Sequence, residues 1–210
     1  MAVIPQHQSI VIVYSTAITT PSAANIEKAI GSPIRQRGTA EGGRAWAAVD
    51  GTTVVVRPQG SGQYRIEVRD LAPAEIDHRR ARDIALLLSP RTGAKPHSVG
   101  VNCDMLIIDP SPDLVASLVD IDDLGAAIGG AKARLASVAL TLNAVGAQAR
   151  FDFQSGTTVG MGTGAPILSI RANYTFAAAS TARLKEVLAD TSLKKADAHL
   201  KRALSRIKVQ

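Results

Sequence analysis

Residues 98–109 read SVGVNCDMLIID, the longest apolar run of the chain, and they decide the fold that the sequence predicts. Apolar residues recur at every second position, a period of two that is typical of a strand with a buried face. These positions are Val99, Val101, Cys103, Met105 and Ile107. Residues 111–113, SPD, then supply a helix cap, a proline for the first turn and an acid near the positive helix end. The stretch therefore predicts a strand, a tight turn and a helix over residues 112–119.

A similar order of elements is predicted before this stretch. Asp50-Gly51 is a strong two-residue hairpin signal between two short strands, and Gly31 is suited to end a helix. The expected elements are a strand over 8–14, a helix from Thr20 to Gly31, strands over 44–49, 52–57 and 63–69, and a helix from Pro73 to Ser89. In that second helix we expect Ile76, Ile84, Leu87 and Leu88 to face inward, and His78, Arg79, Arg80 and Arg82 to face water.

After the opening stretch, one segment fits two periods. Residues 135–144 carry apolar side chains at helical spacing and also in alternation. We favour a strand, because residues 148–153 form a natural hairpin partner across Val145-Gly146. The sequence then predicts a strand over 167–176 and helices over 181–188 and 192–207.

The pattern predicts an α+β fold with a mainly antiparallel sheet from two similar β-α-β-β-β-α halves and helices packed on one face. Residues 1–96 form the first half, and residues 97–210 form the second half with a basic C-terminal helix. The halves share no clear residue-level identity, so the repeat is one of pattern. We expect one compact domain in which both halves share a single sheet.

Composition limits the classes of function. The chain has three Phe, three Tyr and one Trp, so its core consists mainly of Ala, Val, Ile and Leu, and few rings are available to stack on single-stranded nucleic acid. A single cysteine excludes an internal disulfide and fits a cytoplasmic location. We see no signal peptide and no apolar run of about 18 residues, so we expect no membrane span.

Two stretches could bind an ion. Residues 155–166, SGTTVGMGTGAP, contain Gly160, Gly162 and Gly164, whose backbone N–H groups could approach a phosphate. A helix start should follow such a loop, but a strand pattern follows here, so we favour a plain connection. Residues 98–131 hold six aspartates and no Lys or Arg, but they lack the spacing of a calcium loop, and we predict no metal site. The six are Asp104, Asp109, Asp113, Asp120, Asp122 and Asp123.

No catalytic constellation is apparent. Cys103 would need a neighbouring base to act as a nucleophile, and no spacing places a histidine beside it, so we expect a buried apolar role. The histidines, which also lack metal-ligand spacing, are His7, His78, His97 and His199. We predict no catalytic residue and no cofactor, and we lean against an enzyme.

The C-terminal segment 192–210 combines an apolar stripe with basic residues. Its charge suits nucleic acid or another anion, whereas the alternative is a helix that packs through its stripe and keeps its charges in water. The candidate anion-binding residues are Lys194, Lys195, Lys201, Arg202, Arg206 and Lys208.

Three functions remain open at this point. The leading hypothesis is a non-catalytic binding or adaptor protein that uses an open sheet face or a groove between the halves for a protein or other macromolecular partner. The second is nucleic-acid binding through the basic C-terminal helix. The third is binding of a small anion or nucleotide, or catalysis, at residues 155–166. Self-association of the chain is a further expectation.

Overall fold

The computed structural model describes residues 2–40, 42–71, 73–90, 93–108, 137–157 and 166–208. The described strands form one nine-stranded antiparallel sheet, in the order β2-β3-β4-β5-β1-β6-β9-β8-β7. Four helices accompany the sheet in these residues. The predicted α+β class, with an antiparallel sheet, is confirmed.

The bounds of the strands show long strands at the centre of the sheet and shorter ones toward one edge. The strands are β1 Ala2–Tyr14, β2 Ile34–Ala40, β3 Gly43–Ala48, β4 Thr53–Pro58, β5 Tyr64–Leu71, β6 Pro96–Ile108, β7 Ser137–Ala144, β8 Ala147–Thr157 and β9 Pro166–Ala177.

The stretch SVGVNCDMLIID lies in β6, in the middle of the sheet. β6 pairs with β1 along nearly its whole length, from Ala2 opposite Ile108 to Tyr14 opposite Pro96, and it pairs with β9 on its other side. The boundary between the two predicted halves is therefore a hydrogen-bonded strand pair, with no gap between β1 and β6.

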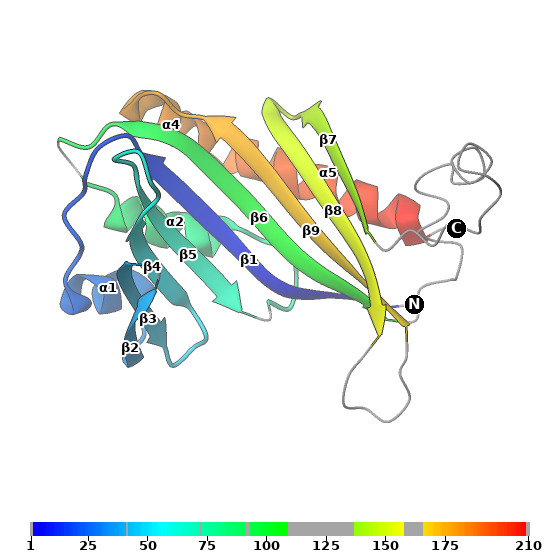
Figure 1. Cartoon of the computed structure of the whole chain (residues 1–210), viewed down its shortest axis with the longest axis horizontal. Helices are drawn as coiled ribbons and strands as arrows, with labels where there is room; N and C mark the ends of the chain where they lie inside the picture. The colour runs from blue at the N-terminus through cyan, green and yellow to red at the C-terminus, as the bar shows by residue number, and fades with distance from the viewer. Residues whose placement is uncertain are drawn as a thin grey trace.

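One face of the sheet carries the core. Side chains that alternate along β1, β6 and β9 are fully buried there, including Ile10, Val101 and Tyr174, which lie in one row across the sheet. Helices α2 (Arg79–Leu88), α4 (Thr181–Val187) and α5 (Asp190–Lys208) lie behind the strands in Figure 1, on this face. The predicted packing of helices on one face is confirmed for the described residues.

The helices begin and end where the sequence supplies caps. α1 (Ala23–Ile30) begins after Ser22, whose hydroxyl accepts from the Asn25 amide, and ends at Gly31 in the left-handed conformation (φ 72°). α2 is Arg79–Leu88, α4 is Thr181–Val187 and α5 is Asp190–Lys208. α5 buries Leu193, Ala196, Leu200 and Leu204 in the core.

The structure corrects the predicted second helix. α2 begins at Arg79, six residues after Pro73, because the side chain of Gln8 holds Asp77 outside the helix. The Gln8 amide donates to the Asp77 carbonyl (2.8 Å) and accepts from the Asp77 N–H (2.9 Å). Two predicted orientations are also wrong. His78, expected to face water, is buried (1% exposed), and Leu87, expected to face the core, is 70% exposed.

Strands β2 and β7 differ in how well the sequence predicts them. β2 was not predicted, so four strands rather than three follow α1; its Arg- and Gly-containing sequence IRQRGTA lacks a clear apolar alternation. The ambiguous segment 135–144 contains a strand, β7, and its hairpin with β8 turns at Val145-Gly146 as predicted. The helix predicted over 112–119 lies outside the described residues.

Among the described residues, no helix combines the length and apolar character needed to cross a lipid bilayer.

Candidate binding surface

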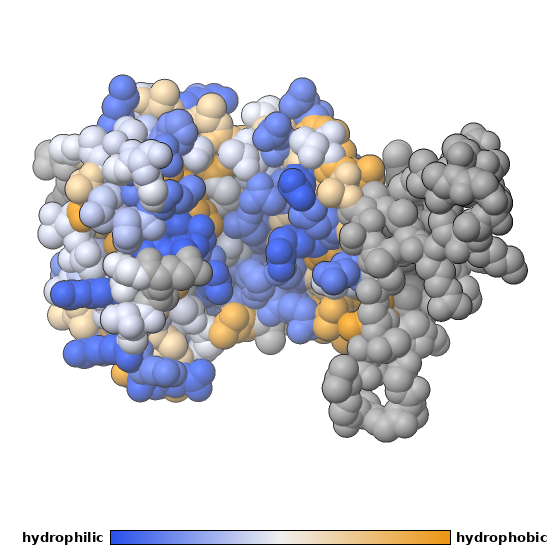
Figure 2. All heavy atoms as spheres, in the orientation of Figure 1, coloured by the Kyte–Doolittle hydropathy of each residue, from blue (hydrophilic) through white to orange (hydrophobic). Residues whose placement is uncertain are grey.

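The face of the sheet opposite the helices is the candidate functional surface, which we call the open face. No helix covers it in the part of the chain that the structure describes, and Figure 2 shows mainly hydrophilic side chains over its middle strands. Strand alternation places on it the polar residues that separate the core residues. From β1, β5, β6, β8 and β9 these include Ser9, Arg65, Glu67, Arg69, Asn102, Asp104, Arg150, Asp152, Arg171, Asn173 and Thr175.

A hydrogen-bonded chain of side chains crosses the centre of this face. The side-chain amide of Asn102 donates to the Ser9 hydroxyl (3.1 Å), and the side-chain amide of Asn173 donates to Asn102 Oδ1. The Thr175 hydroxyl continues the chain by donating to Asn173 Oδ1 (2.8 Å). Three strands therefore present fixed, uncharged polar groups, because each side chain is held by its neighbour.

Charged side chains on β5 are paired within the face. Glu67 is buried, and its two carboxylate oxygens accept from Arg65 and from Arg69 (Nε–Oε1 2.5 Å). Burial alone would raise the pKa of Glu67, but the hydrogen bonds and charges of Arg69 and Arg65 outweigh it and hold the pKa below its usual value of 4.5. Glu67 is therefore ionised at neutral pH and fixes both arginines.

The other half of the open face is also internally paired. Arg150 binds Asp152 through two nitrogens at 2.8–3.0 Å along β8. Asp104 lies between Arg171 and His7, with both N···O distances at 3.4 Å. These charged side chains are thus paired with each other. Ligand specificity on this part of the face therefore depends on the uncharged polar groups.

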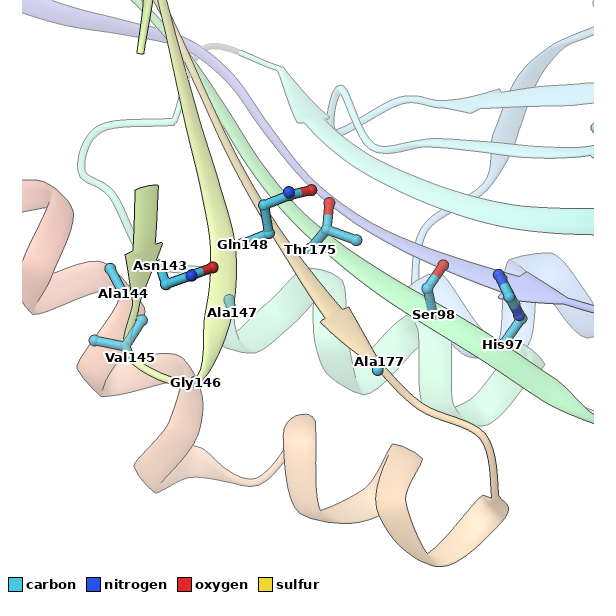
Figure 3. A pocket seen from close by; sticks show the side chains of 10 residues that line it. All are labelled: His97, Ser98, Asn143, Ala144, Val145, Gly146, Ala147, Gln148, Thr175 and Ala177. Atoms are coloured by element: carbon cyan, nitrogen blue, oxygen red, sulfur yellow. The ribbon is translucent and has the colours of Figure 1, made fainter. Parts of the chain in front are cut away.

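A pocket of about 740 Å³ opens on this face, near the turn between β7 and β8 (Figure 3). Its polar side chains come from β6, β7, β8 and β9, and Asn143 points toward Gln148 from the neighbouring strand. Small apolar side chains and the Val145-Gly146 turn form the rest of the pocket wall. The lining residues are His97, Ser98, Asn143, Ala144, Val145, Gly146, Ala147, Gln148, Thr175 and Ala177.

The chemistry of this pocket is neutral. Apart from His97, its polar side chains are two carboxamides and two hydroxyls, which both donate and accept hydrogen bonds, and no Asp, Glu, Lys or Arg among the described residues lines it. Gln148 and Thr175 are exposed and lie directly opposite each other on β8 and β9. These groups suit a ligand that presents amides or hydroxyls rather than a phosphate or a metal.

The turn that shapes the pocket is strained. Val145 has φ 50°, in the left-handed region, which a β-branched side chain rarely adopts, and Gly146 follows at φ 77°. This geometry is that of a two-residue hairpin turn in which Asn-Gly is the usual sequence. The half-buried Val145 side chain packs against the core, which offsets part of the strain.

Beneath the sheet, His78 forms a buried junction with the C-terminal helix. Its Nδ1 lies 2.7 Å from Asp197 Oδ1 of α5, and its Nε2 lies 2.8 Å from the backbone carbonyl oxygen of Asn102 in β6. A backbone carbonyl can only accept, so His78 Nε2 donates to Asn102. The junction joins α2, α5 and the sheet, and it has no access to the open face.

Among the residues that the structure describes, the other buried groups are not arranged as a nucleophilic site. Burial, with the negative charges of Asp104 and Asp197, raises the pKa of the Cys103 thiol to about 12, so the thiol stays protonated. Burial likewise raises the pKa of Tyr174, whose hydroxyl bonds His199 Nδ1 (2.8 Å). Within the described residues, no three His, Cys, Asp or Glu side chains are placed to hold a metal ion.

The predicted anion-binding residues lie on α5, which packs on the helix-covered face of the sheet, and none of them lines the pocket among the described residues. Lys194, Lys195, Lys201 and Arg202 are exposed, opposite the buried stripe of the helix. Arg206 and Lys208 lie in its last turns, and their side chains are outside the described residues, as are the glycines of 158–165 and every aspartate of the acidic segment except Asp104. The binding predictions for these residues stay predictions.

Sequence reasoning missed the residues of the pocket. The open face itself was expected, but Asn143, Gln148 and Thr175 meet only through the strand order β9-β8-β7. The available signal was the hairpin at Val145-Gly146, which makes Asn143 and Gln148 direct cross-strand neighbours.

Comparison with known proteins finds no family model that matches the chain and no similar curated protein.

Proposed function

We propose that this chain is a non-catalytic binding protein that holds a polypeptide partner against the open face, with the pocket as the anchoring point. The observation that carries the proposal is the carboxamide and hydroxyl lining of the pocket, with Asn143 and Gln148 side by side. Carboxamides pair with the N–H and C=O groups of a peptide backbone, since each offers both a donor and an acceptor. We therefore expect an extended, polar, uncharged peptide segment as ligand.

The remainder of the open face supports a protein partner. The ion pairs that Glu67, Asp104 and Asp152 form with arginines give the open face a polar character, as the rims of protein interfaces have. The aromatic side chains lie in the core or against it, so stacking of bases or sugar rings on the open face is disfavoured. They are Tyr14, Trp46, Tyr64, Phe151, Phe153, Tyr174 and Phe176.

The test uses a random-peptide library and the full chain. Peptides selected on the immobilised protein should be enriched in polar, uncharged residues. Their dissociation constants, measured by fluorescence anisotropy, should rise about tenfold in the double variant Asn143→Ala, Gln148→Ala, because two hydrogen bonds of about 0.5–1.5 kcal/mol each are lost. Both side chains are exposed, so the variant should unfold at the wild-type temperature.

Two results contradict this proposal. One is a library that yields no binding peptide. The other is a set of peptides whose affinity is unchanged in the double variant.

A second candidate function is anion or nucleic-acid binding through α5. The supporting observation is that Lys194, Lys195, Lys201 and Arg202 are exposed together on one helix whose other side is buried. Duplex DNA binding through these residues would weaken steeply as salt is raised, because phosphate contacts release counterions. Replacement of Lys201 and Arg202 by Glu should abolish it, and binding insensitive to salt would exclude it.

The third hypothesis, a small-anion or nucleotide site at residues 155–166, stays a prediction. A thermal-shift screen of the full chain with nucleotides tests it, and a flat response contradicts it.

A further inference from the structure

The two edges of the sheet differ in how they are protected. β2 forms one edge, where Arg35 and Arg37 are exposed and the pairing register shifts between Ile34 and Gln36. Charges and bulges of this kind are what proteins use to prevent a sheet edge from pairing with another chain.

The opposite edge has none of these features. β7 (Ser137–Ala144, SVALTLNA) pairs only with β8 among the described strands, and lies at the end of the sheet in Figure 1. Its register with β8 runs without a shift from Ser137 to Ala144. It contains no charged residue and no proline. An edge of this kind presents a row of backbone donors and acceptors that fits another strand.

Two exposed leucines add an apolar strip to this edge. Leu140 and Leu142 are 38% and 39% exposed. Leu142 lies opposite Ala149, which pairs with the core residue Tyr174, so both leucines lie on the helix-covered face. Together they offer apolar surface that a strand added at this edge would bury.

We propose that β7 is a self-association edge, where a second copy of this chain adds its own β7 antiparallel to form one continuous sheet. An uncharged strand is suited to its own copy, because no like charges meet across the pair. A basic or acidic partner would gain nothing from this edge. The proposal goes beyond the peptide-binding function and does not depend on it.

Symmetry restricts the register of the pairing. A two-fold axis perpendicular to the sheet keeps the helices of both copies on one face, so residues on the same face must oppose each other. With Thr141 on the axis, Leu140 of one copy lies opposite Leu142 of the second copy, and the two exposed leucine pairs cover each other. Residues 138–144 then overlap.

The first test is the mass of the full chain by light scattering. We expect a dimer of twice the 21.9 kDa chain mass, stable in low and high salt because the contact is uncharged. Leu140→Lys and Leu142→Lys should each raise the dimer dissociation constant at least tenfold. Leu87→Lys, the same change at a leucine that is 70% exposed on α2, should leave it unchanged.

The second test reads the register directly. Cys103 is buried, so a cysteine introduced at Thr141 is the reactive thiol, and the proposed register brings two copies of it within disulfide distance. Mild oxidation should convert Thr141→Cys to a covalent dimer, whereas Thr39→Cys on the β2 edge should remain a monomer in a denaturing gel.

A monomeric wild-type chain at all concentrations would overturn the proposal. A dimer that survives both lysine substitutions would also overturn it. If the monomeric lysine variants still bind peptide, the proposed peptide-binding function does not depend on dimerisation.

Discussion

At the scale of single residues, the buried polar groups link segments that are distant in the sequence. His78, near the start of α2, contacts Asp197 of α5 and the Asn102 carbonyl of β6, 119 and 24 residues away. Buried groups of this kind stabilise one arrangement, because any other arrangement leaves them without partners.

The contact between His78 and Asp197 yields the first prediction. Asp197→Ala removes the hydrogen-bond partner of His78 Nδ1 and leaves a buried polar atom unpaired, which should lower the free energy of unfolding by about 1–3 kcal/mol. Urea unfolding followed by circular dichroism measures this. Asp83→Ala, at an aspartate that is 60% exposed, is the control and should change stability little. An unchanged urea midpoint for Asp197→Ala would show that the contact contributes nothing.

Glu67 yields a prediction on pH. Because Arg69 and Arg65 hold its folded pKa below 4.5 despite burial, its stabilising effect is complete above the unfolded pKa and disappears as the pH falls through the folded pKa. Wild type should exceed Glu67→Gln in unfolding free energy by about 1–3 kcal/mol at neutral pH. The difference should shrink progressively below about pH 4.5. A difference that is constant from neutral to acid pH would contradict this origin.

At the scale of elements, the strands and caps were largely predictable and the start of α2 was not. The alternation in β1, β6 and β9 and the Gly31 cap are local signals, and each structural element lies where they indicate. The start of α2 depends on Gln8 of β1, whose side chain hydrogen-bonds the backbone of Asp77. The two residues are 69 positions apart in the sequence. Tertiary contacts of this kind override local propensity.

The β7–β8 turn yields a third prediction. Asn tolerates the left-handed conformation that Val145 adopts, so Val145→Asn should raise the free energy of unfolding by about 1 kcal/mol. Thermal unfolding measures the gain. Val49→Asn, at a valine that is 63% exposed and has no positive φ, should give no gain. Destabilisation by Val145→Asn would mean that the packing of Val145 outweighs its strain.

At the scale of the whole molecule, one continuous sheet separates two environments. The helix-covered face holds the core, and the open face holds paired charges, a central amide chain and a neutral pocket. The sequence predicted the two faces from alternation alone. It could not predict the pocket, because β6, β9, β8 and β7 become neighbours only through the strand order of the folded sheet.

The central claim is that ligands bind at the open face rather than at the basic helix α5. Thr175→Trp places a bulky side chain in the pocket at an exposed position, and Lys194→Trp places the same side chain on an exposed position of α5. The decisive measurement is the dissociation constant of one library-selected peptide for the wild type and both variants. We expect at least a tenfold loss of affinity for Thr175→Trp, which corresponds to about 1.4 kcal/mol or more, and less than a twofold change for Lys194→Trp. Loss of affinity in Lys194→Trp with full affinity in Thr175→Trp would contradict it.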